Sequence, residues 1–135
     1  MVLSSLCAGA FEFDSIDLNE PYYKVTQEIS KRGYSYNHEL NCLQGDCRGT
    51  VIYLSINYLD VTKSGMLGQL IVNIPFKSGE DFLSNAISIF NVLYHQVEPV
   101  DGNVAYQVDP DGTQLVVSRK NEFLTLTYNT PYYKH

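Results

Sequence analysis

Two cysteines, Cys42 and Cys47, bracket four residues in the first half of the chain, and Gly45 lies between them. Glycine adopts backbone conformations that other residues avoid, so this segment is expected to fold back as a tight turn. The segment from Thr50 to Tyr58 follows directly and is apolar on both faces, which indicates a central strand of a sheet. We therefore expect the rest of the chain to pack around a cysteine-bracketed turn and the strand after it.

Length and charge narrow the classes of protein to which the chain can belong. Its 135 residues suffice for one domain with a core of its own, and 44% hydrophobic against 18% charged residues is typical of folded globular chains. The net charge of −6 argues against binding to nucleic acid or to anionic membranes, which requires clustered Lys and Arg. Outside the first ten residues, no run reaches the roughly 18 apolar residues of a membrane span.

The first ten residues carry no charge and end in Ala8-Gly9-Ala10, a pattern typical of the end of a secretory signal peptide. We therefore expect residues 1–10 to be the remnant of a signal peptide, residues 11–135 to form a single α+β domain, and the protein to be periplasmic or secreted. Cleavage after Ala10 would remove Cys7 and leave Cys42 and Cys47 as an even pair, which in an exported protein predicts a disulfide. The alternatives are a buried N-terminal strand for residues 1–10 and a metal site for the cysteines. A metal site requires more thiolates or histidines at ligand spacing, so no metal or other cofactor is expected.

Two helices are predicted from apolar residues at helical spacing. The first spans Glu20 to Arg32, with Asn19 as its N-cap and Pro21 in its first turn. The second spans Ser78 to Val97 and ends before Pro99. Its apolar stripe, which is expected to be buried, consists of Phe82, Ala86, Ile89, Phe90, Leu93 and Val97.

Three strands are expected after each helix, because apolar and polar residues alternate in segments that turn sequences separate. The six segments are Tyr34–Leu40, Thr50–Tyr58, Leu67–Phe76, Val104–Val108, Gln114–Ser118 and Phe123–Tyr128. The sequence thus predicts an α+β fold of two αβββ units, with one antiparallel sheet and both helices packed on one face. The turn Asp109-Pro-Asp-Gly112 is expected to be held by its own polar groups. The alternative for Asp109 and Asp111 is a carboxylate pair for catalysis or Ca²⁺.

Eleven tyrosines and no tryptophan are the unusual feature of the composition. Tyrosine supplies a large contact area with a polar tip and is enriched in protein interfaces, although it also suits half-buried positions on a sheet. The residues expected to contact a partner are those at or beside the cysteine-bracketed turn. They are Leu43 and Gln44 at its tip and the nearby Tyr34, Tyr36, Tyr53 and Tyr58.

Two short segments resemble known families of small exported proteins. The run Ile16-Asp-Leu-Asn-Glu-Pro-Tyr-Tyr-Lys-Val25, with Ile29 and Gly33-Tyr34, resembles the opening of αβββ units in the β-lactamase-inhibitor-protein/BamE-like group, whose members work by binding other proteins. The segment between Cys42 and Cys47 is similar to the cysteine-bracketed loop of Ivy-type lysozyme inhibitors. Asp46 matches that family's Asp, whereas Gly45 stands in place of its His.

No sequence motif of a hydrolase, protease, nucleotide-binding or redox site is present. The sequence therefore favours a small exported bacterial module that binds another protein, of the inhibitor, immunity or envelope-assembly type, with no catalytic site. Two alternatives remain open. One is a small hydrolase with an unrecognised site, which a cleft around His38 or His95 would favour. The other is a cytosolic scaffold domain with reduced thiols.

Overall fold

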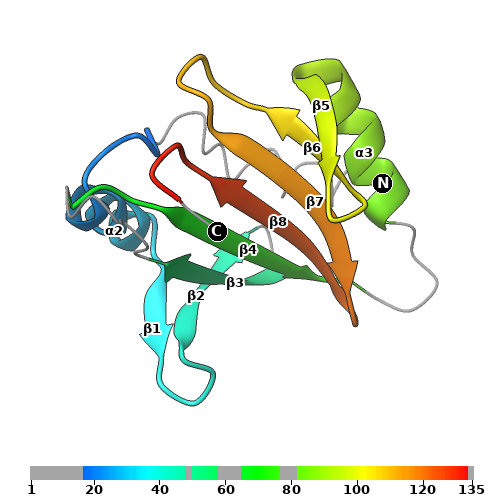
Figure 1. The fold of residues 1–135 in the computed structure, drawn as a ribbon. Coiled ribbons are helices and arrows are strands. Elements are labelled where there is room, and N and C mark those ends of the chain that lie inside the picture. The colour runs from blue at the N-terminus through cyan, green and yellow to red at the C-terminus, as the bar shows by residue number, and fades with distance from the viewer. Residues whose placement is uncertain (1–16, 48–49, 58–64, 77–81, 134–135) are drawn as a thin grey trace.

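The structure is a computed structural model of the chain and describes residues 17–47, 50–57, 65–76 and 82–133 (Figure 1). Two helices and eight strands lie within these ranges. In chain order they are α2 (Tyr22–Lys31), β1 (Ser35–Asn37), β2 (Cys42–Cys47), β3 (Thr50–Asn57), β4 (Gln69–Pro75), α3 (Phe82–Leu93), β5 (His95–Val100), β6 (Asn103–Gln107), β7 (Gln114–Lys120) and β8 (Phe123–Asn129). Neither helix is long and apolar enough to cross a membrane.

The eight strands form one antiparallel sheet in the order β1-β2-β3-β4-β8-β7-β6-β5, which confirms the expected α+β class. Each helix is followed by four strands, so the expectation of three strands per unit is wrong. Each set of four strands is connected in sequence order. The two sets join through β4 and β8, the last strand of each (Figure 1).

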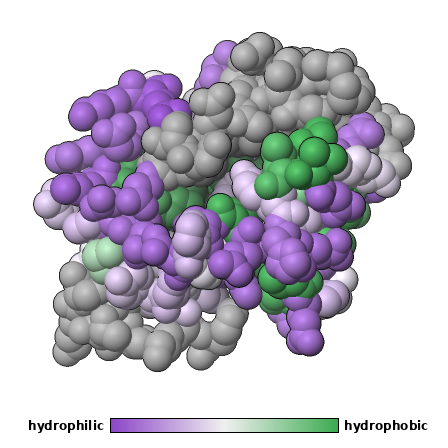
Figure 2. Space-filling view, turned by 90° about the horizontal axis from the view of Figure 1, so that it is seen from above, coloured by the Kyte–Doolittle hydropathy of each residue, from purple (hydrophilic) through white to green (hydrophobic). Residues whose placement is uncertain are grey.

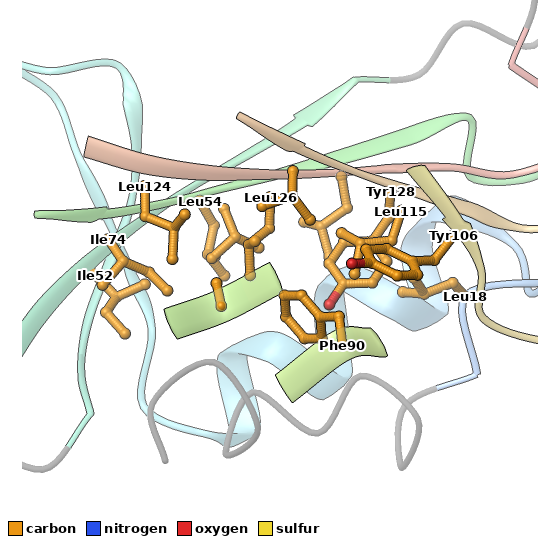
Figure 3. Close-up of a cluster of buried hydrophobic side chains, with 14 of the residues drawn as sticks. Leu18, Ile52, Leu54, Ile74, Phe90, Tyr106, Leu115, Leu124, Leu126 and Tyr128 are labelled. Atoms are coloured by element: carbon orange, nitrogen blue, oxygen red, sulfur yellow. The ribbon is translucent and has the colours of Figure 1, made fainter. Parts of the chain in front are cut away.

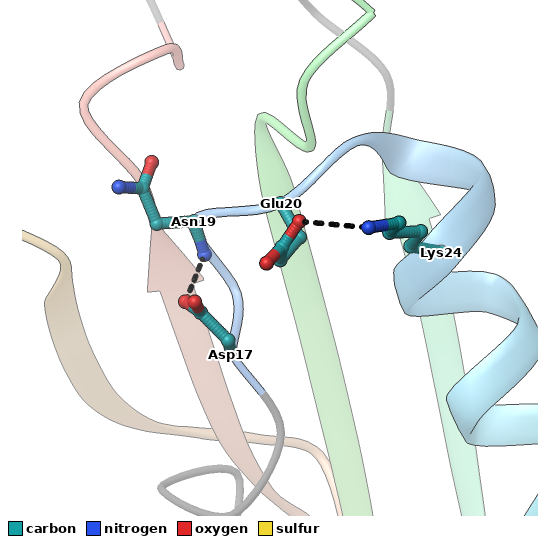
Figure 4. Close-up of polar contacts among 4 residues, drawn as sticks. All are labelled: Asp17, Asn19, Glu20 and Lys24. Atoms are coloured by element: carbon teal, nitrogen blue, oxygen red, sulfur yellow. Dashed lines mark hydrogen bonds and ion pairs between the residues drawn. The ribbon is translucent and has the colours of Figure 1, made fainter.

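Helix α2 starts two residues later than predicted, and its N-cap is Pro21 and not Asn19. Pro21 offers no side-chain acceptor to the first turn. The segment before the helix is ordered by Asp17 instead, whose Oδ1 accepts a hydrogen bond of 2.9 Å from the backbone N–H of Asn19 (Figure 4). Glu20 and Lys24 form an exposed ion pair at 3.8 Å, a kind of contact that adds little stability.

The core lies against the apolar face of the sheet and includes residues from both helices (Figure 3). Val25 and Ile29 of α2 and Ala86 and Phe90 of α3 are buried, as their helical spacing predicted. The strand residues of the core alternate along their strands, as expected. They are Ile52, Leu54, Leu70, Val72, Ile74, Tyr106, Leu115, Val117, Leu124, Leu126 and Tyr128.

Helix α3 ends at Leu93, four residues before its predicted end. The predicted apolar stripe is therefore wrong at its last two positions, since Leu93 is 56% exposed and Val97 lies in β5. Pro99 does not end the helix either. It lies in β5, an edge strand of the sheet, where a missing backbone N–H is tolerated.

Tyr106 of β6 packs against α3 and connects this helix to the sheet. Its ring is fully buried against Phe90, with ring centroids 5.9 Å apart, and its hydroxyl donates a hydrogen bond of 2.7 Å to Asn91 Oδ1. Burial raises the pKa of Tyr106, so the hydroxyl stays protonated and able to donate at neutral pH.

A row of polar side chains crosses six strands on one line of the register. It runs Asn57, Gln69, Asn129, Gln114, Gln107 and His95, from β3 to β5. Within it, Asn57 Nδ2 donates to Gln69 Oε1 at 2.6 Å, and Gln69 Nε2 donates to Asn129 Oδ1 at 2.9 Å. Because a register slip would break these bonds, the row specifies how β3, β4 and β8 align.

Two alanine substitutions in α3 test the observed buried face. Phe90→Ala should lower the free energy of unfolding by about 3–5 kcal/mol, because Phe90 is a buried aromatic residue. Leu93→Ala, the matched control one turn further along, should lower it by less than about 1 kcal/mol, because its side chain is mostly exposed. Urea unfolding of the two variants measures both values, and equal losses would show that the buried face is misassigned.

Candidate functional site

The segment from Cys42 to Cys47 is strand β2 and not a turn. Five register pairs, from Leu43–Leu54 to Cys47–Thr50, hold it against β3. Gly45 serves close packing here, because a Cβ at this position would lie 2.5 Å from Cε2 and 2.8 Å from Cγ of Tyr34. The Tyr34 ring thus covers the glycine, and the two residues fix how the chain enters β1 after α2.

The disulfide expected between Cys42 and Cys47 is absent, and Cys42 is a free cysteine. The extended strand explains why this bond does not form. The five residue-to-residue steps from Cys42 to Cys47, each of about 3.3 Å, place the two Cα atoms roughly 16 Å apart. A disulfide requires a separation under about 7 Å. Partial burial raises the pKa of the Cys42 thiol, so little of it is thiolate at neutral pH.

The turn of this region lies instead between β1 and β2, at residues 38–41. Asn37 Oδ1 accepts hydrogen bonds of 3.0 Å from the backbone N–H groups of Glu39 and Leu40. Asn41 has a φ of 53°, and its Oδ1 accepts a hydrogen bond from the Tyr36 hydroxyl. Side chains of the hairpin therefore determine the conformation of its own loop.

The β1–β2 hairpin projects from the edge of the sheet (Figure 1) and exposes apolar area. Tyr36 is 48% exposed and Leu40 is 57% exposed. The Tyr36 ring also makes an edge contact with the His38 ring, at 4.6 Å between centroids. By contrast, the described residues on the face of the molecule seen in Figure 2 are mainly hydrophilic, with apolar residues in separate small groups.

A hollow of about 480 Å³ lies beside this hairpin. Residues of the first three strands line it together with Gly33, and its lining is mainly polar. The lining residues on the strands are Ser35, Tyr36, Asn37, Gln44, Gly45, Asp46 and Val51. Asn37 Nδ2 donates a hydrogen bond of 2.7 Å to Gln44 Oε1 across the wall. Asp46 is the one ionisable carboxylate among these residues and is exposed.

The structure brings together only some of the residues predicted to contact a partner. Tyr36 and Gln44 line the hollow, and Tyr53 is the register neighbour of Gln44 on β3. Leu43 is not at a tip, because it lies opposite Leu54 and packs against the core.

Tyr34 is also packed against the core, and Tyr58 lies outside the described residues. Sequence reasoning missed Asn37, Leu40 and Asp46. The spacing of Asn37 and Asn41, with three residues between them, is the signal that marks the true loop.

Other chemistry considered from the sequence does not assemble around this site. His38 lies in the β1–β2 loop and His95 begins β5 at the opposite edge of the sheet, so the fold keeps the two exposed histidines apart. Asp109 holds its own turn, since its Oδ1 accepts a hydrogen bond of 3.1 Å from the Thr113 N–H. In the part of the chain that the structure describes, no group of three His, Cys, Asp or Glu side chains is placed to hold a metal ion.

Comparison with protein-family models, with curated proteins and with solved structures finds no match to this chain.

The free thiol gives a direct test of the β2 assignment. Iodoacetamide added to the unfolded, unreduced protein should alkylate Cys42, because no bond protects it. In the folded protein the same reaction should be slower, because burial raises the pKa of the thiol. Peptide mass mapping measures both, and a Cys42–Cys47 cross-linked peptide would contradict the extended strand.

Proposed function

We propose that this chain is a protein-binding module and that the β1–β2 hairpin is its main recognition element. The observation that carries the proposal is the pair of exposed side chains, Tyr36 on β1 and Leu40 on the loop, in a hairpin whose loop is held by its own hydrogen bonds. A preorganised loop loses less conformational entropy on binding than a flexible one. Tyrosine is enriched among the residues that contribute most to protein interfaces.

The proposal includes the class of module expected from the sequence. Small exported inhibitors, immunity proteins and envelope-assembly factors bind partners without catalysis of their own, and a projecting hairpin suits that role. Export rests on the uncharged segment 1–10, which lies outside the described residues. Because Cys42 is a free cysteine, no disulfide orders the hairpin, and side-chain hydrogen bonds order it instead.

We further propose that the two halves are a structural repeat with both helices on one face of the sheet. In support, residues of α2 and α3 belong to the same buried cluster, and the strand order is symmetric about the β4–β8 pair. This arrangement would place the hairpin and β5 at equivalent ends of the two halves. A comparison with β5 therefore shows which features are specific to the hairpin.

Affinity capture with hairpin variants tests the proposed function. The double variant Tyr36→Ala/Leu40→Ala should lose most of its partner, at least about tenfold in affinity, because it removes the exposed anchors of the loop. Its melting temperature should stay within a few degrees of the original, because both side chains are on the surface. The measurement is capture of one stoichiometric partner from an extract of the native host, followed by titration of that partner.

The control changes another exposed apolar pair elsewhere on the molecule. Val92 and Leu93 of α3 are 85% and 56% exposed, so Val92→Ala/Leu93→Ala removes exposed apolar groups without touching the hairpin. This variant should bind the partner with unchanged affinity. Unaltered binding by the hairpin variant would refute the proposed recognition element, and so would loss of binding by the α3 variant alone.

A further inference from the structure

The two edges of the sheet are built differently. The outer strands are β1 and β5. β5 carries three features that hinder pairing with another strand: Pro99 has no backbone N–H, Glu98 is exposed, and the register breaks between Val97 and Val100. Native proteins protect edge strands by such means. The edge formed by β5 is therefore closed to a further strand.

Among the residues that the structure describes, the edge formed by β1 has none of these protections. Its sequence is Ser35-Tyr36-Asn37, with no proline and no charge, and its three residues pair with β2 in unbroken register. Because one side of β1 bonds to β2, the backbone groups on its other side face outward from the sheet. Ser35 and Tyr36 are exposed. An extended segment can therefore continue the sheet at this edge, as in recognition by strand addition.

The hollow lies where alternate side chains of an added strand would reach. Its lining includes all three residues of β1 and continues over β2 to Val51 of β3. In recognition by strand addition, backbone hydrogen bonds supply affinity, and pockets for alternate side chains supply specificity. Ser35, Asn37 and Gln44 offer hydrogen-bonding groups, and among the described lining residues Asp46 is the one with a charged side chain. This lining suits the ammonium or guanidinium group of a Lys or Arg side chain.

We propose that an extended segment of a partner protein pairs with β1 as a ninth strand and places a basic side chain in the hollow beside Asp46. The inference rests on the proposed function and specifies how the partner binds. The net charge of −6 favours a basic segment over a second copy of the chain. A second copy paired through β1 would also bring no basic side chain from the strand, whose residues are all uncharged.

A defined set of peptides tests the proposal without knowledge of the partner. The probe is fluorescein-labelled Thr-Val-Lys-Val-Thr, and its two relatives carry norleucine or Glu in place of Lys. The Lys peptide should bind about tenfold more tightly than the norleucine peptide, and the Glu peptide should bind most weakly. Fluorescence anisotropy measures the three affinities. In ¹⁵N spectra the largest amide shifts should fall on residues 35–37 and on Asp46.

Methylation of peptide backbone nitrogens separates strand addition from contact through side chains alone. Successive N–H groups of a strand point to opposite sides, so methylation of one alternating set should abolish binding. Methylation of the other set should leave binding within about threefold. Loss with both sets, loss with neither, or absence of binding by the Lys peptide would each overturn the proposal.

Two protein variants complete the test. Asp46→Asn should remove most of the preference for Lys over norleucine, because the charge is lost while the shape of the side chain is kept. The matched control is Glu98→Gln at the opposite edge, which should leave every peptide affinity unchanged. An unchanged preference in Asp46→Asn, or shifts centred on residues 95–100, would refute the assignment of the site. Partner capture that depends on Tyr36 and Leu40 while the peptides fail to bind would overturn only the strand-addition inference and leave the proposed function standing.

Discussion

The pairing of β4 with β8 is the interaction on which the rest of the structure depends. Seven register pairs, from Gln69–Asn129 to Pro75–Phe123, connect the last strand of one half to the last strand of the other. Without them, the chain would be two separate four-stranded sheets, each with one helix. Core side chains alternate on both strands, and the hydrogen bond between Gln69 and Asn129 holds the register on the other face. The single core and the single sheet both follow from this contact.

The pattern of apolar and polar residues is sufficient to predict five of the eight described strands. β3, β4, β6, β7 and β8 lie where their patterns indicated, and α2 follows from Val25 and Ile29. The sequence of β2, Cys-Leu-Gln-Gly-Asp-Cys, predicts a turn because it has low strand propensity. Pairing with β3 and the ring of Tyr34 over Gly45 outweigh that propensity, and both involve residues distant in the sequence or in the opposite strand.

The sequence does not predict β5, for a related reason. Val97 continues the helical spacing of α3, and Pro99 resembles a helix stop, so local pattern favoured one long helix. The segment becomes a strand because β6 pairs with it, and an edge position tolerates the proline. The candidate site was predicted in part. Tyr36 and Gln44 were identified from composition and position, whereas Leu43 and Tyr34 pack inward once β2 is a strand. Asn37 enters the site only through the register of β1 and β2, and Asp46, which the sequence marks only as a match to the Asp of Ivy-type inhibitors, enters it through the register of β2 and β3.

If β4 and β8 join the two halves into one cooperative unit, native-state hydrogen exchange tests that claim most directly. The amides of β4 and β8 should exchange only through global unfolding and share the highest protection, with the same dependence on denaturant in both halves. Amides of the β1–β2 hairpin should exchange through smaller, local openings, because β1 has only three paired residues. Two distinct unfolding free energies, one for β1 to β4 and another for β5 to β8, would contradict the account.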